Sequence, residues 1–148
     1  MIYRHEQVGR VYIWLLGFAA VACVAFAIGT RATSIAAADA SLFMFAFITL
    51  VCIAFARLSI DVDASGLRWG MTFGIPGGFI PMEEIVSVDV VPVSFWYGIG
   101  IHLTLRGWVW NVAFGRGVQI HRCGGMPIVL GTDEPEALVA AIGRGRSG

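Results

Sequence analysis

The chain has 148 residues, of which 57% are apolar and only 14% are charged, and its formal net charge is zero. A soluble domain averages about 25% charged residues, so the composition excludes a chain that is soluble throughout. Residues 58–148 carry six arginines, no lysine and eight acidic residues, which excludes the basic surface of a nucleic-acid-binding domain. The three cysteines are an odd number and exclude a disulfide framework.

Two long apolar stretches near the N-terminus predict transmembrane helices. Residues 11–29 hold no charge and would form a helix about 28 Å long, close to the roughly 30 Å hydrocarbon core of a bilayer. Residues 36–56 form the second predicted span, and the short connection requires an antiparallel hairpin. A cleaved signal peptide is disfavoured because a second span follows. Asp39 is interpreted either as an acid that complements the dipole at the start of the second helix or as an intramembrane ion or proton site.

The arginines around the two spans predict the orientation of the chain. Four lie on the outer sides of the pair and one lies in the connection: Arg4, Arg10, Arg57 and Arg68 against Arg31. Cytoplasmic loops are enriched in basic residues, so we expect an integral membrane protein with both termini and the soluble domain in the cytoplasm. Residues 1–57 are therefore assigned to a transmembrane helical hairpin.

After the second span the sequence alternates as β-strands do. Residues 58–63 alternate with period two, and residues 67–73 alternate again after a turn, which predicts a hairpin. The glycines of residues 74–78 indicate a loop. Pro92 is expected to end the strand before it or to place that strand at a sheet edge. A short apolar run, residues 79–81, follows the loop, and further strands are expected over 85–91, 98–106, 108–112, 118–121 and 128–130, about seven strands in all.

The strand over residues 98–106 has two chemically distinct faces. Four apolar residues alternate with four other residues: Ile99, Ile101, Leu103 and Leu105 against Gly100, His102, Thr104 and Arg106. In a strand the two sets point to opposite faces of the sheet. Residues 118–121 and 128–130 are expected to pair as a further hairpin across a glycine-rich turn.

A helix is predicted at the C-terminus. Asp133 is the expected N-cap, with Glu136 as its capping-box partner. Apolar residues recur at helical spacing on one face: Leu138, Val139 and Ile142. A helix of about ten residues is unstable alone, so it should dock on the sheet. The predicted soluble domain is 58–143, and 144–148 form a flexible tail.

Strands followed by one amphipathic helix are the element order of a pleckstrin-homology-like (PH-like) domain. The predicted fold is therefore a membrane α-helical hairpin plus a β-rich (α+β) domain, a curled sandwich of about seven antiparallel strands capped by the helix. Four motifs carry a family resemblance: DVDASGLRW, IPMEEIVSVDVV, FWYGIGIHLTLRGWVWNV and GTDEPEALVAAI. With the two spans, they resemble a group of small bacterial membrane proteins with a C-terminal PH-like domain. The resemblance covers most of residues 1–143 and implies that fold, in the bacterial inner membrane.

No motif in the sequence predicts catalysis. His121 and Cys123 are two residues apart and His102 lies well before them, which is not the spacing of a metal site. Glu83 and Glu84 are adjacent and diverge, so they do not form a general acid/base couple. We therefore expect no catalytic residue, metal or cofactor, and a protein that is not an enzyme.

Aromatic and polar residues around the strand over 98–106 suggest an interaction face. The aromatic residues are interpreted either as core and edge packing or as rings that enter the interfacial zone of a membrane: Phe95, Trp96, Tyr97, Trp108 and Trp110. Polar side chains are expected to line a groove beside them. The candidate face comprises Trp96, Tyr97, His102, Thr104, Arg106, Trp108 and Asn111.

Three functional hypotheses follow from this architecture. The first is a membrane-anchored interaction module whose sheet edge or open sandwich end binds a protein partner, or a second copy of the chain, at the membrane surface. The second is binding of a lipid or small ligand by the PH-like domain, although the domain lacks the basic loop of anionic-lipid binders. The third is an accessory subunit of a transport assembly, which requires Asp39 to face the interior of a helix bundle.

Overall fold

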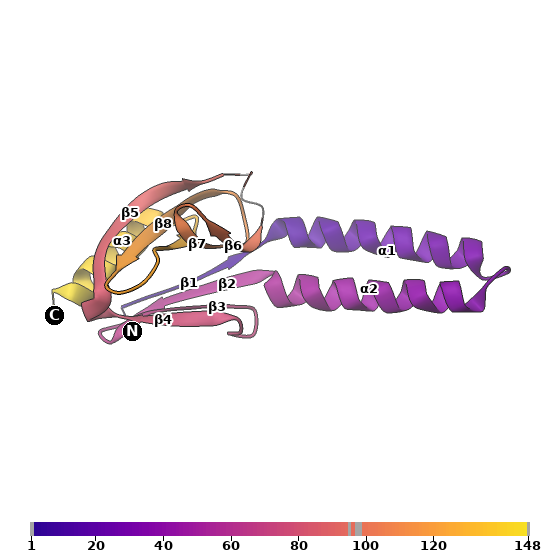
Figure 1. Cartoon of the computed structure of the whole chain (residues 1–148), viewed down its shortest axis with the longest axis horizontal. Coiled ribbons are helices and arrows are strands. Elements are labelled where there is room, and N and C mark those ends of the chain that lie inside the picture. The colour runs from indigo at the N-terminus through magenta and orange to yellow at the C-terminus, as the bar shows by residue number, and fades with distance from the viewer. Residues whose placement is uncertain (1, 95, 97–98, 148) are drawn as a thin grey trace.

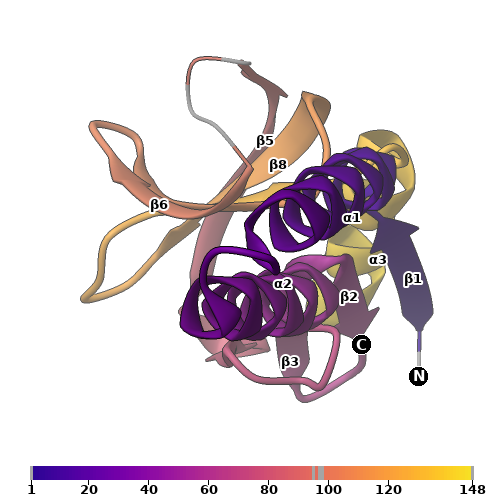
Figure 2. The ribbon, with the colours of Figure 1, turned by 90° about the vertical axis from the view of Figure 1, so that its right-hand side faces the viewer.

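The structure of the chain, a computed structural model, describes residues 2–94, 96 and 99–147. Two long helices lie side by side and extend from one end of a domain that contains two β-sheets and a C-terminal helix (Figure 1). Figure 2 looks along the two helices toward the domain and shows that both sheets lie behind them.

The helical hairpin matches the predicted spans closely. Helix α1 covers Arg10–Thr30 and helix α2 covers Ile35–Phe55. Each is long and apolar enough to cross a membrane, and only 6% and 11% of their most apolar windows are buried. The apolar side chains therefore point outward from the hairpin, unlike those of a core helix in a soluble protein. The Ser41 hydroxyl donates to the Cys23 carbonyl oxygen at 2.9 Å and joins the two helices.

The residues before α1 form a strand that the sequence did not predict. Strand β1 (Tyr3–Val8) pairs antiparallel with β2 (Arg57–Val62), which directly follows α2. The assignment of residues 1–57 to the hairpin alone is therefore wrong at its N-terminal end. Inward-facing positions of β1 are partly filled by the polar residues His5 and Gln7, so no apolar alternation marks the strand.

The first sheet has the strand order β1-β2-β3-β4. Strand β3 covers Gly66–Met71 and β4 covers Gly77–Pro81. The predicted hairpin is confirmed, because β2 pairs antiparallel with β3 across a short turn. The loop predicted over 74–78 is shorter than expected, since β4 already begins at Gly77. Alternate residues of the sheet are fully buried against the second sheet and the C-terminal helix: Leu58, Ile60, Val62, Leu67 and Ile80.

The second sheet follows a short 3-10 turn, η1 (Met82–Glu84), and has the order β5-β8-β9-β7-β6. Its strands are β5 (Ile85–Val93), β6 (Gly100–Thr104), β7 (Gly107–Asn111), β8 (Gly115–Arg122) and β9 (Ile128–Gly131). The β8–β9 hairpin is confirmed, and β5, which contains Pro92, is an edge strand as expected.

Two expectations about the strands need correction. The described residues contain nine strands in two sheets of four and five, instead of about seven. Strands β7 and β9 are parallel, with Trp108 opposite Ile128, so the second sheet is not wholly antiparallel. The parallel pair arises because β8 does not lie next to β7 in the sheet, and β9 then fills the position between β8 and β7.

Helix α3 (Pro135–Arg146) docks on the core as predicted, through Leu138 and Ile142, which are fully buried. Its N-terminus differs from the expectation. Glu134 is the N-cap and makes no side-chain capping bond, so no capping box forms. Glu136 instead pairs with Arg116 on β8. The helix also continues to Arg146, so the predicted tail is helical over its first three residues.

The segment before α3 contacts β1 and closes one side of the sandwich. His5 Nε2 lies 2.6 Å from Asp133 Oδ1, and the Tyr3 hydroxyl donates to Glu134 Oε2 at 3.4 Å. Burial, with the negative charge of Glu134 beside it, raises the pKa of Tyr3 to about 12. On the opposite side of the sandwich, β4 ends the first sheet, and it belongs to a different sheet from β7.

Candidate functional site

The open side of the sandwich forms a groove with aromatic walls. The space is about 280 Å³ and has lining residues from both sheets: Trp69, Gly78 and Phe79 from the first, and Trp108, Trp110, Arg122 and Ile128 from the second. We call this feature the aromatic groove. Four of its seven lining residues are aromatic, and Trp108 and Trp110 come from the cluster singled out in the sequence.

The base of the aromatic groove is formed by two tryptophan rings. Trp69 on β3 is only 5% exposed, and its ring packs edge-on against Trp110 on β7, with 5.9 Å between centroids and an interplanar angle of 77°. Edge-to-face packing of this kind is favourable because the ring edge is positive and the ring face is negative. The two rings therefore join the sheets at the bottom of the groove.

Gly78 makes room for the Trp69 ring. The two residues are opposite each other in the β3–β4 register. A Cβ at position 78 would lie 2.7 Å from Trp69 Cη2 and closer still to Cζ2, inside normal carbon–carbon contact of about 3.5–4.0 Å. Only glycine lets the ring lie against β4 here. The glycine-rich pattern of residues 74–78 predicts a loop and does not indicate this role.

Trp69 also carries an unsatisfied polar group. Its indole N–H is buried and has no hydrogen-bond acceptor among the described residues. A buried donor without an acceptor typically costs about 1–3 kcal/mol. This buried indole N–H therefore costs the folded domain free energy that the packing around Trp69 must offset.

The mouth of the aromatic groove is formed by partly exposed side chains. Phe79 and Trp108 are 42% and 40% exposed and contribute to the lining from different sheets. Phe79 is opposite Arg68 in the β3–β4 register and so lies at the outer rim of the groove, on the face of the first sheet turned away from Trp69. The Arg68 guanidinium lies over the Phe79 ring, 5.2 Å from its centroid, as a cation–π contact. Arg122 is held in the wall, because its Nε donates to the Met126 carbonyl oxygen at 3.2 Å.

An unpaired strand edge runs beside the aromatic groove. Strand β4 is the last strand of the first sheet, and among the described residues no strand pairs with its outer edge. In an edge strand, alternate N–H and C=O groups point outward and are available to another chain. Gly78 and Phe79 belong both to this edge and to the groove lining. The arrangement thus places backbone hydrogen-bonding groups next to pockets for apolar side chains.

The predicted interaction face is divided between two faces of the second sheet. Residues directly opposite each other in paired strands share a face of the sheet. In the β6–β7 register, Trp108 is opposite Leu103. His102 is opposite Val109, and Asn111 is opposite Gly100, one step out of phase with Trp108. Trp108 therefore faces the aromatic groove, and His102 and Asn111 face the other way. This corrects the expectation that these residues line one surface.

The remaining residues of the predicted face have structural or solvent-exposed positions. The Thr104 hydroxyl donates to the Gly107 carbonyl oxygen at 3.0 Å and accepts from the Arg106 backbone N–H at 3.1 Å, which stabilises the β6–β7 turn. Asn111 is fully buried. Trp96 is 90% exposed before β6, and Tyr97 lies outside the described residues.

The apolar face of the strand over 98–106 reaches the core only in its first half, where Ile99 and Ile101 are partly buried against it. Leu103 is 58% exposed and Leu105 is fully exposed. Figure 2 shows β6 reaching sideways away from β1 and the helices, and β6 is an edge strand. The predicted strand is confirmed over Gly100–Thr104 but is shorter than expected, because Leu105 and Arg106 form the turn before β7. Residue 98 lies outside the described residues.

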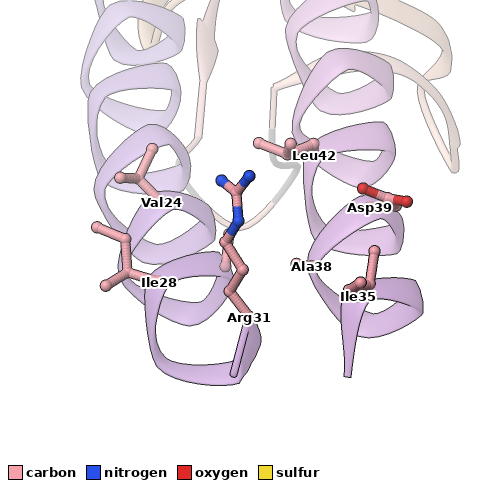
Figure 3. A pocket seen from close by; sticks show the side chains of 8 residues that line it. Val24, Ile28, Arg31, Ile35, Ala38, Asp39 and Leu42 are labelled. Atoms are coloured by element: carbon pink, nitrogen blue, oxygen red, sulfur yellow. The ribbon is translucent and has the colours of Figure 1, made fainter. Parts of the chain in front are cut away.

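A second hollow lies at the free end of the helical hairpin. Its lining includes Arg31 and Asp39, and the Arg31 side chain points between the two helices (Figure 3). Within the described part of the chain, no ion pair joins these two residues. Asp39 is exposed and lies in the second turn of α2, because the helix begins at Ile35 with Ser34 as its N-cap. Asp39 thus lies near the N-terminal end of α2, and its interpretation as an acid that complements the helix dipole stays a prediction.

The described residues contain no group of three or more His, Cys, Asp or Glu side chains arranged to hold a metal ion. Comparison of the chain with models of protein families, with curated proteins and with solved structures finds no match. The aromatic groove is therefore interpreted from its own geometry.

Proposed function

We propose that this protein is a non-enzymatic, membrane-anchored binding module that holds an extended segment of a partner protein in the aromatic groove. Helices α1 and α2 cross the bilayer, and the β-rich domain, which we propose is PH-like from the sequence resemblance and the C-terminal helix, lies at the membrane surface. We expect this domain and both termini in the cytoplasm of a bacterium, because the arginines outside the hairpin outnumber the one in its connection.

The anchoring is supported by the surface of the hairpin. Its apolar side chains are exposed: Trp14, Phe18, Val21, Ile28, Phe43 and Leu50 are each at least half exposed. Contiguous apolar surface of this size is unfavourable in water and suits lipid. The hairpin and the sheet are also joined directly, because the Gly9 N–H donates to the Ala56 carbonyl oxygen at 2.7 Å. Gly9 immediately precedes α1, and Ala56 immediately follows α2. The domain would therefore keep a nearly fixed position at the surface.

The binding proposal depends on one observation, the position of the aromatic groove beside the unpaired edge of β4. Extended peptides commonly add a strand to such an edge, with backbone hydrogen bonds for affinity and side-chain pockets for specificity. Tryptophans in partly closed pockets are the residues that most often dominate binding energy. At about 280 Å³, the groove is at the lower limit of small-molecule pockets, roughly 300–1,000 Å³. A side chain of a bound segment fits this space better than a whole lipid or cofactor.

Site-specific photo-crosslinking of the full-length protein tests the proposal. Benzoylphenylalanine replaces Phe79, at the mouth of the aromatic groove, in cells that express the protein in its natural setting. A matched control places it at Val86 on β5, which is similarly exposed, at 53%. We expect one reproducible protein adduct from position 79 and none from position 86. Absence of an adduct at position 79, or equal adducts at both positions, would refute the proposal.

A further inference from the structure

The turn between β3 and β4 presents two large apolar side chains outside the hydrophobic core. Phe73 is 65% exposed and Ile75 is 78% exposed. They flank Gly74, whose φ of +75° and N–H bond to the Met71 carbonyl oxygen at 2.7 Å form a tight turn. A turn that faces water normally carries polar residues, so two bulky apolar side chains at this place need an explanation.

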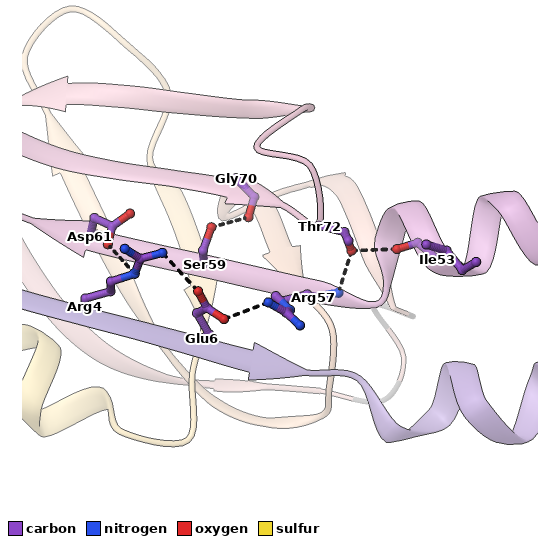
Figure 4. A network of polar contacts seen from close by, with 8 residues as sticks. All are labelled: Arg4, Glu6, Ile53, Arg57, Ser59, Asp61, Gly70 and Thr72. Carbon is purple, nitrogen blue, oxygen red and sulfur yellow. Dashed lines mark hydrogen bonds and ion pairs between the residues drawn. The ribbon is translucent and has the colours of Figure 1, made fainter.

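This turn is attached to the end of α2. The Thr72 hydroxyl donates to the Ile53 carbonyl oxygen at 2.6 Å, and the Thr72 backbone N–H donates to the Ala54 carbonyl oxygen at 3.3 Å. The same hydroxyl accepts from the Arg57 backbone N–H at 3.2 Å. Figure 4 shows Thr72 between Ile53 and Arg57, and Figure 1 shows the turn at the end of the domain nearest α2. The turn therefore lies level with the last residues of the second apolar helix.

The charges at this junction match a lipid headgroup layer. Arg10 begins α1 and is exposed, and Arg57 directly follows the end of α2 and is 48% exposed at its side chain. Arg57 Nη1 lies 2.9 Å from Glu6 Oε2, which joins β2 to β1 at the same level (Figure 4). Arginines at this depth can contact lipid phosphates. The apolar helices lie on one side of these arginines and the polar domain lies on the other side. Groups follow the same order across a membrane interface, from acyl chains through charged headgroups to water.

We propose that residues 72–76 form a third membrane contact, in which Phe73 and Ile75 enter the boundary between the headgroups and the acyl chains. The inference rests on the proposed membrane anchoring and adds to it. Three contacts that do not lie on one line define a plane, so α1, α2 and this turn together set the tilt of the domain. The tilt in turn sets the direction in which the aromatic groove faces the cytoplasm.

Spin labelling of the full-length protein in vesicles tests this contact. The three native cysteines are replaced by alanine, and a nitroxide is attached to a single cysteine in Phe73→Cys, reconstituted in phosphatidylcholine with one quarter phosphatidylglycerol. Collision rates with oxygen, which enters lipid, and with a polar nickel chelate, which stays in water, report the depth of the label. Phe18→Cys on α1, 77% exposed, is the lipid control, and Val86→Cys, 53% exposed and on the far side of the domain, is the water control.

We expect the label at position 73 to resemble that at position 18, with oxygen collisions several-fold more frequent than those at position 86 and nickel collisions several-fold rarer. A label at position 73 that behaves like the one at position 86, with position 18 in lipid, would overturn the third contact and leave the anchoring intact. A label at position 18 that is accessible to nickel would overturn the anchoring itself. Ile75→Cys serves as the independent second site if circular dichroism shows that Phe73→Cys disturbs the domain.

Discussion

Replacement of Gly78 by alanine should close the base of the aromatic groove. The added Cβ would lie 2.7 Å from Trp69 Cη2 and 3.0 Å from Cε2, so the ring must shift by about 1 Å to restore normal contact. Trp69 cannot move freely, because it is 5% exposed and packs on Trp110. Overpacking of this kind typically costs about 1–3 kcal/mol. For a domain of this size each kcal/mol lowers Tm by about 4–8 °C.

The measurement is thermal unfolding in detergent micelles, followed by near-ultraviolet circular dichroism, which reports the packing of the Trp69–Trp110 pair. Gly143→Ala is the control, because a Cβ at position 143 in α3 meets no atom within 4 Å. In a helix this change should be neutral or stabilising by up to about 1 kcal/mol. A Gly78→Ala variant with the wild-type Tm and an unchanged aromatic spectrum would refute the role given to this glycine.

Three further predictions concern the groove, the core and one turn. Trp108→Ala should reduce the crosslink at the groove mouth more than tenfold, as loss of a binding hot spot of about 2 kcal/mol implies, and Leu105→Ala should leave its yield unchanged. Leu138→Ala should lower the free energy of unfolding by about 2–5 kcal/mol, because the side chain is fully buried; a loss below about 1 kcal/mol would contradict the packing of α3. Hydrogen bonds from the Ser65 hydroxyl and backbone N–H to Asp63 Oδ1, at 2.5 and 2.8 Å, lower the pKa of Asp63. Because its pKa is about 4 in the unfolded chain and lower in the folded one, the ionised carboxylate stabilises the turn above about pH 4 and this contribution is lost as the pH falls through the folded pKa. The Tm difference between wild type and Asp63→Asn should accordingly be present at pH 7 and shrink below pH 4; a difference that does not change with pH would refute the assignment.

The composition of the chain determined the helical hairpin. Residues 11–29 and 36–56 differ from the observed helices by no more than one residue at each end. A long uncharged stretch is a local property, and helix formation satisfies every backbone group within the segment itself. The same holds for the hairpins β2–β3 and β8–β9, because period-two alternation on both sides of a turn specifies pairing between neighbours in the chain.

Only the tertiary structure decided which distant strands meet. Strand β1 pairs with β2 across two intervening helices, and β7 pairs in parallel with β9 across the whole of β8. The aromatic groove depends on the same long-range contacts, since Trp69 and Trp110 belong to different sheets. Alternation shows that a residue is on one face of a strand, but it does not show which element covers that face. Trp108 and Leu105 both read as apolar strand residues, but Trp108 lines the groove from β7 whereas Leu105 lies in the β6–β7 turn and is fully exposed.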